Sequence, residues 1–139
     1  MTKTPKILIL EDDPEFGALV SDSLQRAGYD TSLFSDVSKA IGVFESEDFD
    51  LVVADLIIKK EGVITSEGGL ILTWRIREIA ESKGITVPVI AMSGSVHHLG
   101  MQHALDTARH MGADEVMAKP FSPQDLLERV EKVLAGHQD

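Results

Sequence analysis

The 139-residue sequence contains no cysteine. This absence excludes disulfide bonds, thiolate metal ligands and cysteine nucleophiles, and it is typical of proteins in a reducing compartment. Long hydrophobic runs are also missing, and the apolar stretch near the N-terminus is too short for the core of a signal peptide. We therefore expect a cytoplasmic protein with neither an exported nor a membrane-spanning segment.

Basic residues are scarce. The chain has 13 Lys and Arg against 23 Asp and Glu, which gives a formal net charge of −10. Proteins that bind nucleic acid directly need Lys and Arg to displace the counterions of the phosphates, so we do not expect such binding. The length indicates one domain, and 43% hydrophobic with 26% charged residues is typical of a soluble globular protein.

Short apolar runs alternate with amphipathic segments along the chain. The runs predict strands at residues 6–10, 29–34, 49–54, 87–92 and 115–118. The helical periodicity predicts helices at 14–27, 36–45, 70–81, 96–111 and from 123 onward, with Asp13 and either Ser35 or Asp36 as N-caps. This order favours an α/β fold, a parallel sheet with helices on both faces.

The segment from Ile57 to Gly69 lacks this regularity. Its two lysines and three glycines predict a loop, which is long for a connection in an α/β protein. In the helix that follows, we expect Trp74 and the neighbouring leucine and isoleucine positions to pack into the core or against another helix.

Polar residues stand at the carboxyl ends of four predicted strands: Glu11 and Asp12, then Asp55, Ser93 and Lys119. Ligands of such folds bind at this edge of the sheet. Alone, Asp55 is more simply interpreted as an aspartate that ends a strand. Three clustered carboxylates repel one another, however, by about 4 kcal/mol for each pair at ~4 Å and an effective dielectric constant of 20. Bound Mg²⁺ together with Lys119 would offset this repulsion.

The same residue types suit phosphoryl transfer. A carboxylate on the central strand, Asp55, can act as the nucleophile, Lys119 as a point charge and Ser93 as a hydroxyl donor. A metal held by the carboxylates would neutralise the oxygens of the phosphoryl group.

Four stretches match a known pattern in order: residues 7–14 (ILILEDDP), 50–56 (DLVVADL), 88–94 (PVIAMSG) and 112–121 (GADEVMAKPF). Over residues 5–135 the chain resembles the CheY-like receiver domain of bacterial two-component response regulators, with residues 136–139 as a frayed tail. The resemblance implies a five-stranded parallel sheet in the order 2-1-3-4-5.

The resemblance also implies roles for the acidic residues. Asp55 would accept a phosphoryl group from a sensor histidine kinase or a histidine phosphotransfer protein. Asp12, Asp55 and the backbone carbonyl of Ile57 would bind Mg²⁺, and Glu11 would act through a water molecule on the metal.

Further implications concern Lys119, Ser93 and the output. Lys119 would contact the phosphoryl group and precede a cis bond to Pro120, and Ser93 would report occupancy to the face of the fourth helix, fifth strand and fifth helix. A downstream protein would bind that face. We expect a single-domain regulator, a monomer or weak dimer, and no enzyme beyond self-catalysed phosphoryl transfer and autodephosphorylation.

The chain departs from the family pattern in four places. Lys59 stands where the family usually has proline, and a Gly-Gly pair near the third helix comes about six residues late. Val116 replaces the switch aromatic of the fifth strand. The segment between Ser93 and Lys119 is a few residues longer than usual, and we expect the extra length at the start of the fourth helix, at 96–101. The histidines at 97, 98, 103 and 110 are expected to be exposed or partly packed rather than metal ligands, because they lack a carboxylate partner at metal-site spacing.

Two alternatives remain at this point. A degenerate receiver would bind a partner without phosphorylation. A small phosphatase or hydrolase would need a second acid near Asp55, but Ile57 occupies the position two residues beyond it. Lys59 and Lys60 could steer an anionic phosphodonor, although a solvated pair of loop lysines is the simpler interpretation.

Overall fold

The computed structural model describes residues 4–56, 58–60, 63–65, 67–93, 106, 109 and 112–136, and only the backbone of 58–60, 63–65 and 67–70. Its elements follow in chain order: β1 (Lys6–Leu10), α1 (Pro14–Arg26), β2 (Asp30–Phe34), α2 (Val37–Ser46), β3 (Leu51–Asp55), β4 (Ile58–Lys60), β5 (Val63–Thr65), α3 (Glu67–Lys83), β6 (Val89–Ser93), β7 (Glu115–Ala118) and α5 (Pro123–Gly136).

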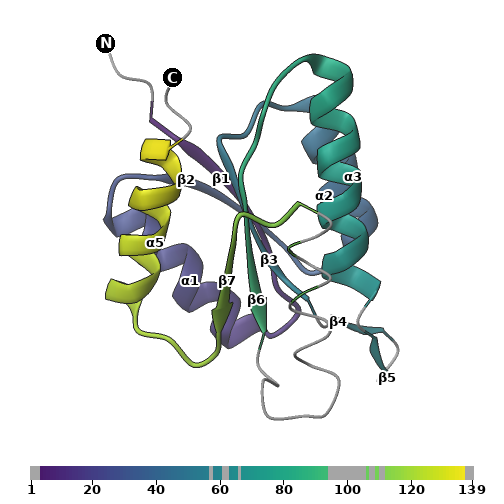
Figure 1. The fold of residues 1–139 in the computed structure, drawn as a ribbon. Coiled ribbons are helices and arrows are strands. Elements are labelled where there is room, and N and C mark those ends of the chain that lie inside the picture. Colours follow the sequence, from purple (N-terminus) through teal and green to yellow (C-terminus); the bar gives the residue numbers. More distant parts are fainter. Residues whose placement is uncertain are drawn as a thin grey trace.

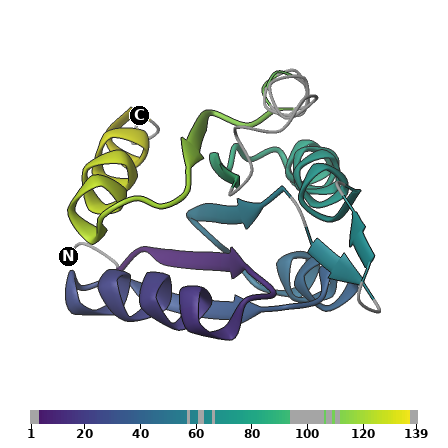
Figure 2. The same cartoon turned by 90° about the horizontal axis from the view of Figure 1, so that it is seen from below.

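Five strands form one sheet in the order β2-β1-β3-β6-β7, and every neighbouring pair is parallel. Helices α1 and α5 cover one face, and α2 and α3 cover the other (Figures 1 and 2). This confirms the predicted fold, in which β6 and β7 are the fourth and fifth strands. The predicted helix at 96–111, with its histidines, lies outside the described residues apart from two helical positions, 106 and 109.

Two hydrophobic cores form because alternate residues of a strand point to opposite faces of the sheet. In β1, Ile7 and Ile9 pack with residues of α1 and α5, whereas Leu8 and Leu10 pack with residues of α2 and α3. All four are fully buried. The central strands are therefore covered on both sides, as their near-continuous apolar sequences predict.

Side chains and glycine define the helix ends. The Asp13 carboxylate accepts hydrogen bonds from the backbone N–H groups of Glu15 and Phe16 at 3.0 and 3.3 Å, which confirms the predicted cap. Asp36, rather than Ser35, caps α2. Gly28 follows α1 with a φ of +97°, a conformation that other residues rarely adopt.

The predicted loop over residues 57–69 is wrong. Strands β4 and β5 form an antiparallel pair there, and α3 already begins at Glu67. Glycines and lysines suggested a loop, but the β-branched residues on both sides of Gly62 favour a hairpin. The hairpin lies beside the first turn of α3 (Figure 1).

The predicted packing of Trp74 is also wrong, since its exposed fraction is 50%. The buried hydrophobic positions of α3 are Leu72, Ile76, Ile79 and Ala80, and Thr73 is buried beside them. Trp74 lies two residues from both Leu72 and Ile76, about 200° around the helix at 100° per residue, and so faces solvent. Leu19 of α1 is likewise exposed.

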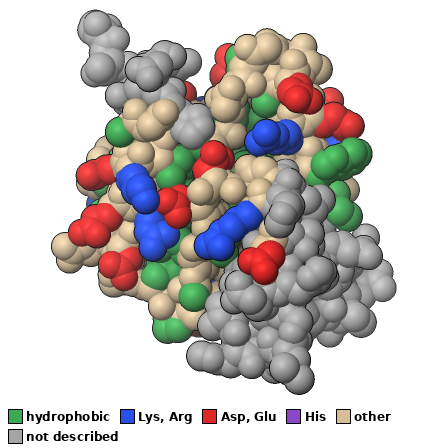
Figure 3. Space-filling view, in the orientation of Figure 1, with side chains coloured by type: hydrophobic (Ala, Val, Ile, Leu, Met, Phe, Trp, Pro, Cys, Tyr) green, Lys and Arg blue, Asp and Glu red, His purple; other side chains and the backbone are tan. Residues whose placement is uncertain are grey.

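Charges of both signs are interspersed on the surface over α5 and β7 (Figure 3). There Arg129 and Lys132 both pair with Glu115. In the described part of the chain, no helix has the length and apolar character that crossing a bilayer requires.

Gly28 and Gly42 allow the conformational effect of glycine to be measured without a steric effect. A Cβ at either position would meet no atom within 4 Å. We expect Gly28→Ala to lower the free energy of unfolding by about 1 kcal/mol, since alanine disfavours a positive φ. Gly42→Ala, inside α2, should raise it by about 0.5–1 kcal/mol. Urea denaturation of both variants measures the two effects, and a destabilised Gly42→Ala would contradict this description of α2.

Candidate acidic acceptor site

Three charged residues occupy equivalent places on three strands. Glu11 follows β1, Asp55 ends β3 and Lys119 follows β7. Each comes two residues after a side chain that packs in the core under α1 and α5, namely Ile9, Val53 and Met117. Because the side-chain direction repeats every two residues along a strand, all three continue toward the same side of the sheet.

Lys119 joins the two acids. Its ammonium group donates hydrogen bonds to Glu11 Oε1 and, at 2.9 Å, to Asp55 Oδ2. The side chains are largely buried, with exposed fractions of 16% for Lys119, 7% for Asp55 and 0% for Glu11. Solvent therefore screens these ion pairs much less than it screens pairs at the surface.

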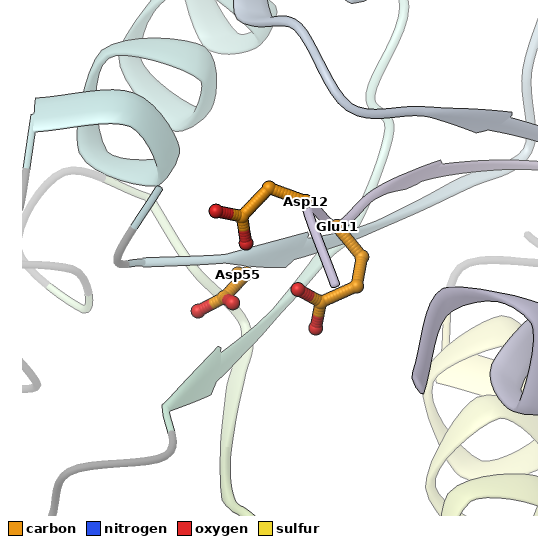
Figure 4. A group of neighbouring side chains, drawn as sticks. All are labelled: Glu11, Asp12 and Asp55. Carbon is orange, nitrogen blue, oxygen red and sulfur yellow. The ribbon is translucent and has the colours of Figure 1, made fainter. Parts of the chain in front are cut away.

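Asp12 completes an acidic group. One carboxylate oxygen each from Glu11, Asp12 and Asp55 lies within 4.8 Å of the others (Figure 4). Three carboxylates and the ammonium of Lys119, which contacts two of them, thus carry a net charge of −2 when all are ionised. The structure brings together the predicted residues Glu11, Asp12, Asp55 and Lys119.

Both oxygens of Glu11 are engaged, because Glu11 Oε2 accepts a hydrogen bond from the backbone N–H of Asp13 at 3.1 Å. Burial raises the pKa of Glu11 to about 7, even though the hydrogen bonds from Lys119 and Asp13 act in the opposite direction. Burial would lower the pKa of Lys119, but its bonds to Glu11 and Asp55 outweigh this effect and raise it. The acidic group therefore favours a proton or a cation as an additional partner of its carboxylates.

Ser93 is fully buried at the end of β6, one residue beyond Met92, the register partner of Asp55. Its backbone carbonyl accepts a hydrogen bond from the backbone N–H of Lys119 at 2.6 Å. Strand pairing thus fixes Ser93 beside Lys119, while a role of its hydroxyl stays a prediction. The Lys119–Pro120 peptide bond is cis, as expected.

The structure describes the remaining predicted positions to different extents. The backbone carbonyl of Ile57 lies outside the described residues. Lys59 lies on β4, where the structure describes the backbone alone. Val116 lies on β7 and packs against a small core of Leu56, Ala91 and Ala113.

One contact of the site was missed at the level of sequence. The ring of Phe16, in the first turn of α1, lies 4.5 Å from the Lys119 ammonium, measured to the ring centroid. Phe16 was not among the predicted site residues, although it lies in the predicted helix at 14–27. The available signal was its position in the sequence, three residues after the capping Asp13 and four after Asp12.

The acidic group offers oxygen donors alone. Hard cations such as Mg²⁺ prefer carboxylate oxygens and retain several waters, whereas zinc sites in proteins usually contain nitrogen or sulfur ligands. The donor set and its net charge therefore fit a magnesium ion.

Comparison with known sequences extends this picture. The model of the response regulator receiver domain family matches residues 7–131. The transcriptional regulatory protein BaeR of Escherichia coli is 28% identical over 131 residues, which cover 94% of this chain and 48% of BaeR. The DNA-binding dual master transcriptional regulator RpaA of Synechocystis is 30% identical over 130 residues, covering 94% and 49%. The chain thus spans about half the length of these relatives.

Solved structures have the same fold. The CheY-like receiver domain protein of Methanospirillum hungatei matches with a TM-score of 0.82 at 20% identity over 98% of both chains. A response regulator of Thermotoga maritima matches with a TM-score of 0.76 at 26% identity, over 96% of this chain and 99% of that one. With the family match spanning nearly the whole chain, these findings show that the protein belongs to the response regulator receiver domain family.

Proposed function

We propose that this receiver domain accepts a phosphoryl group on Asp55 from a histidine kinase or a histidine phosphotransfer protein. The observation that carries the proposal is the contact of Lys119 with Asp55 inside an acidic group at the end of the central strand. Membership in the receiver family supports two-component signalling in general.

In the proposed reaction, an oxygen of the Asp55 carboxylate attacks the phosphorus of a phosphohistidine. A phosphorus–oxygen bond forms, the phosphorus–nitrogen bond breaks, and the imidazole leaves with its electron pair and takes up a proton. Lys119, held at 2.9 Å from Asp55 Oδ2, orients the carboxylate and places a positive charge where the phosphoryl oxygens arrive.

Asp12 and Asp55 would hold Mg²⁺. When bound, the ion neutralises charge on the transferred phosphoryl oxygens. Both oxygens of Glu11 already accept hydrogen bonds, from Lys119 and from the backbone of Asp13. This engagement favours the expected role of Glu11 as an acceptor for metal-bound water rather than as a direct ligand.

The output is proposed to pass through a protein partner. The relatives BaeR and RpaA are about twice as long, and the name of RpaA describes it as DNA-binding. This chain carries a net charge of −10, which disfavours direct contact with the phosphates of DNA. Val116 offers no aromatic ring for rotation on β7. The single-domain type and the oligomeric state stay predictions.

We expect acetyl phosphate with Mg²⁺ to add one phosphoryl group to the protein, and Asp55→Asn to abolish the addition, because an amide oxygen is a far weaker nucleophile than a carboxylate. Intact-protein mass spectrometry measures the product. Asp50→Asn provides the control: Asp50 lies just before the other end of β3 and accepts a hydrogen bond from the backbone of Lys6, which asparagine can also accept.

Phosphorylation that persists in Asp55→Asn would place the acceptor elsewhere. Wild-type protein that gains no phosphoryl group from acetyl phosphate or from a phosphohistidine donor would instead support a phosphorylation-independent interaction module.

Loss of one ligand carboxylate should weaken magnesium binding. We expect Asp12→Asn to raise the dissociation constant by about tenfold or more, measured by isothermal titration calorimetry with MgCl₂. Asp13→Asn is the matched control, since asparagine caps a helix as well as aspartate does and Asp13 is outside the acidic group. Equal affinities for both variants would contradict the assignment of Asp12.

A further inference from the structure

We propose that Phe16 is a positioning residue for Lys119 and, through it, for phosphoryl transfer to Asp55. The proposal rests on the acceptor function above and adds a residue that lies outside the acidic group of Glu11, Asp12 and Asp55. Phe16 belongs to α1, whereas Lys119 follows β7 at the far end of the sequence.

The contact has the geometry of a cation–π interaction. Lys119 Nζ lies 4.5 Å from the centroid of the Phe16 ring, within the range at which the face of an aromatic ring attracts a cation. An ammonium group has three N–H donors, and the carboxylates of Glu11 and Asp55 accept two of them. The ring supplies a third contact, so the ammonium is fixed from three sides.

The attraction is strengthened by burial. Only 16% of the Lys119 side chain is exposed, and desolvated cation–π pairs are stronger than exposed ones. Lysine is a point charge on a flexible four-carbon stem, and it needs such contacts to keep one orientation.

Phe16 is itself held in place. Its backbone N–H donates to the capping carboxylate of Asp13, and its ring makes an edge-to-face contact with Phe121, with centroids 5.4 Å apart and an interplanar angle of 78°. The backbone N–H of Asp13 donates to Glu11, which in turn accepts from Lys119. The contacts of Phe16, Asp13, Glu11 and Lys119 therefore form a closed cycle that includes the ammonium.

The three partners of Lys119 differ in one respect during the reaction. Asp55 changes its chemical state when it is esterified, and Glu11 lies beside the expected metal. The Phe16 ring keeps the same charge distribution throughout. It can therefore hold the ammonium while the bond to Asp55 Oδ2 is exchanged for a contact with phosphoryl oxygen.

A purely hydrophobic role for Phe16 makes a different prediction. If the ring only fills space in the partly buried cluster with Phe121, the quadrupole of the ring is irrelevant and shape alone decides. Fluorination separates the two roles, because successive fluorine atoms withdraw charge from the ring face and change its shape little.

The experiment compares the full-length chain carrying phenylalanine, 4-fluoro-, 3,5-difluoro- or 3,4,5-trifluorophenylalanine at position 16. The measured quantity is the rate constant of phosphorylation at saturating acetyl phosphate and Mg²⁺. We expect a stepwise fall that reaches about fivefold for the trifluoro variant, with an unchanged dissociation constant for Mg²⁺. Phe16→Tyr, which keeps the π face, should retain most of the rate.

Phe49 provides a matched control. Its ring lies 4.9 Å from Lys6 Nζ, a cation–π pair of the same kind. Lys6 begins β1, and Glu11 of the acidic group follows the other end of the same strand. The same fluorine series at Phe49 should leave the phosphorylation rate unchanged.

A rate that stays constant across the Phe16 series, in a protein that is phosphorylated, would overturn this proposal and leave the acceptor function intact. Equal falls for the Phe16 and Phe49 series would also overturn it, because the effect would then be one of general stability. Absence of phosphorylation in the unsubstituted protein would overturn the acceptor function and this proposal together.

Discussion

The site depends on the ammonium group of Lys119, which lies between two buried carboxylates from different strands. Without this charge, Glu11 and Asp55 would be acids with little access to water beside a third acid, an arrangement that costs several kcal/mol. The apolar alternation of β1, β3 and β7 brings the three side chains together, because each continues the row of residues that packs under α1 and α5. The same alternation of side chains along the strands therefore positions both the hydrophobic core and the charged site.

One ammonium does not balance three carboxylates. The raised pKa of Glu11, about 7, is the consequence of its burial in a group that retains excess negative charge. A divalent cation relieves the same excess, and a transferred phosphoryl group brings further negative charge that Lys119 and the cation can both stabilise. The proposed metal binding and the proposed phosphoryl transfer would thus be linked through one electrostatic requirement.

The sequence predicted the parts of the structure that depend on local patterns. Buried strands such as 51–55 are recognisable because both faces are apolar, and Glu11, Asp55 and Lys119 were predicted to meet because parallel strands end at a common edge. The β4–β5 hairpin was missed because glycine and lysine outweighed β-branched residues in the interpretation. Trp74 was misplaced because it lies among leucine and isoleucine positions of one helix, whereas the buried side of α3 passes through Leu72 and Ile76. The contact between Phe16 and Lys119 was missed because it depends on how α1 packs over the sheet.

The most direct test of this account is a crystal structure of the protein with Mg²⁺ and beryllofluoride, an analogue of the phosphoryl group. We expect one beryllofluoride on the Asp55 carboxylate, with a fluorine atom in contact with Lys119 Nζ. One magnesium ion should lie about 2.1 Å from oxygens of Asp12 and Asp55. Beryllofluoride on another residue, or a metal ion bound away from the three carboxylates, would contradict the account.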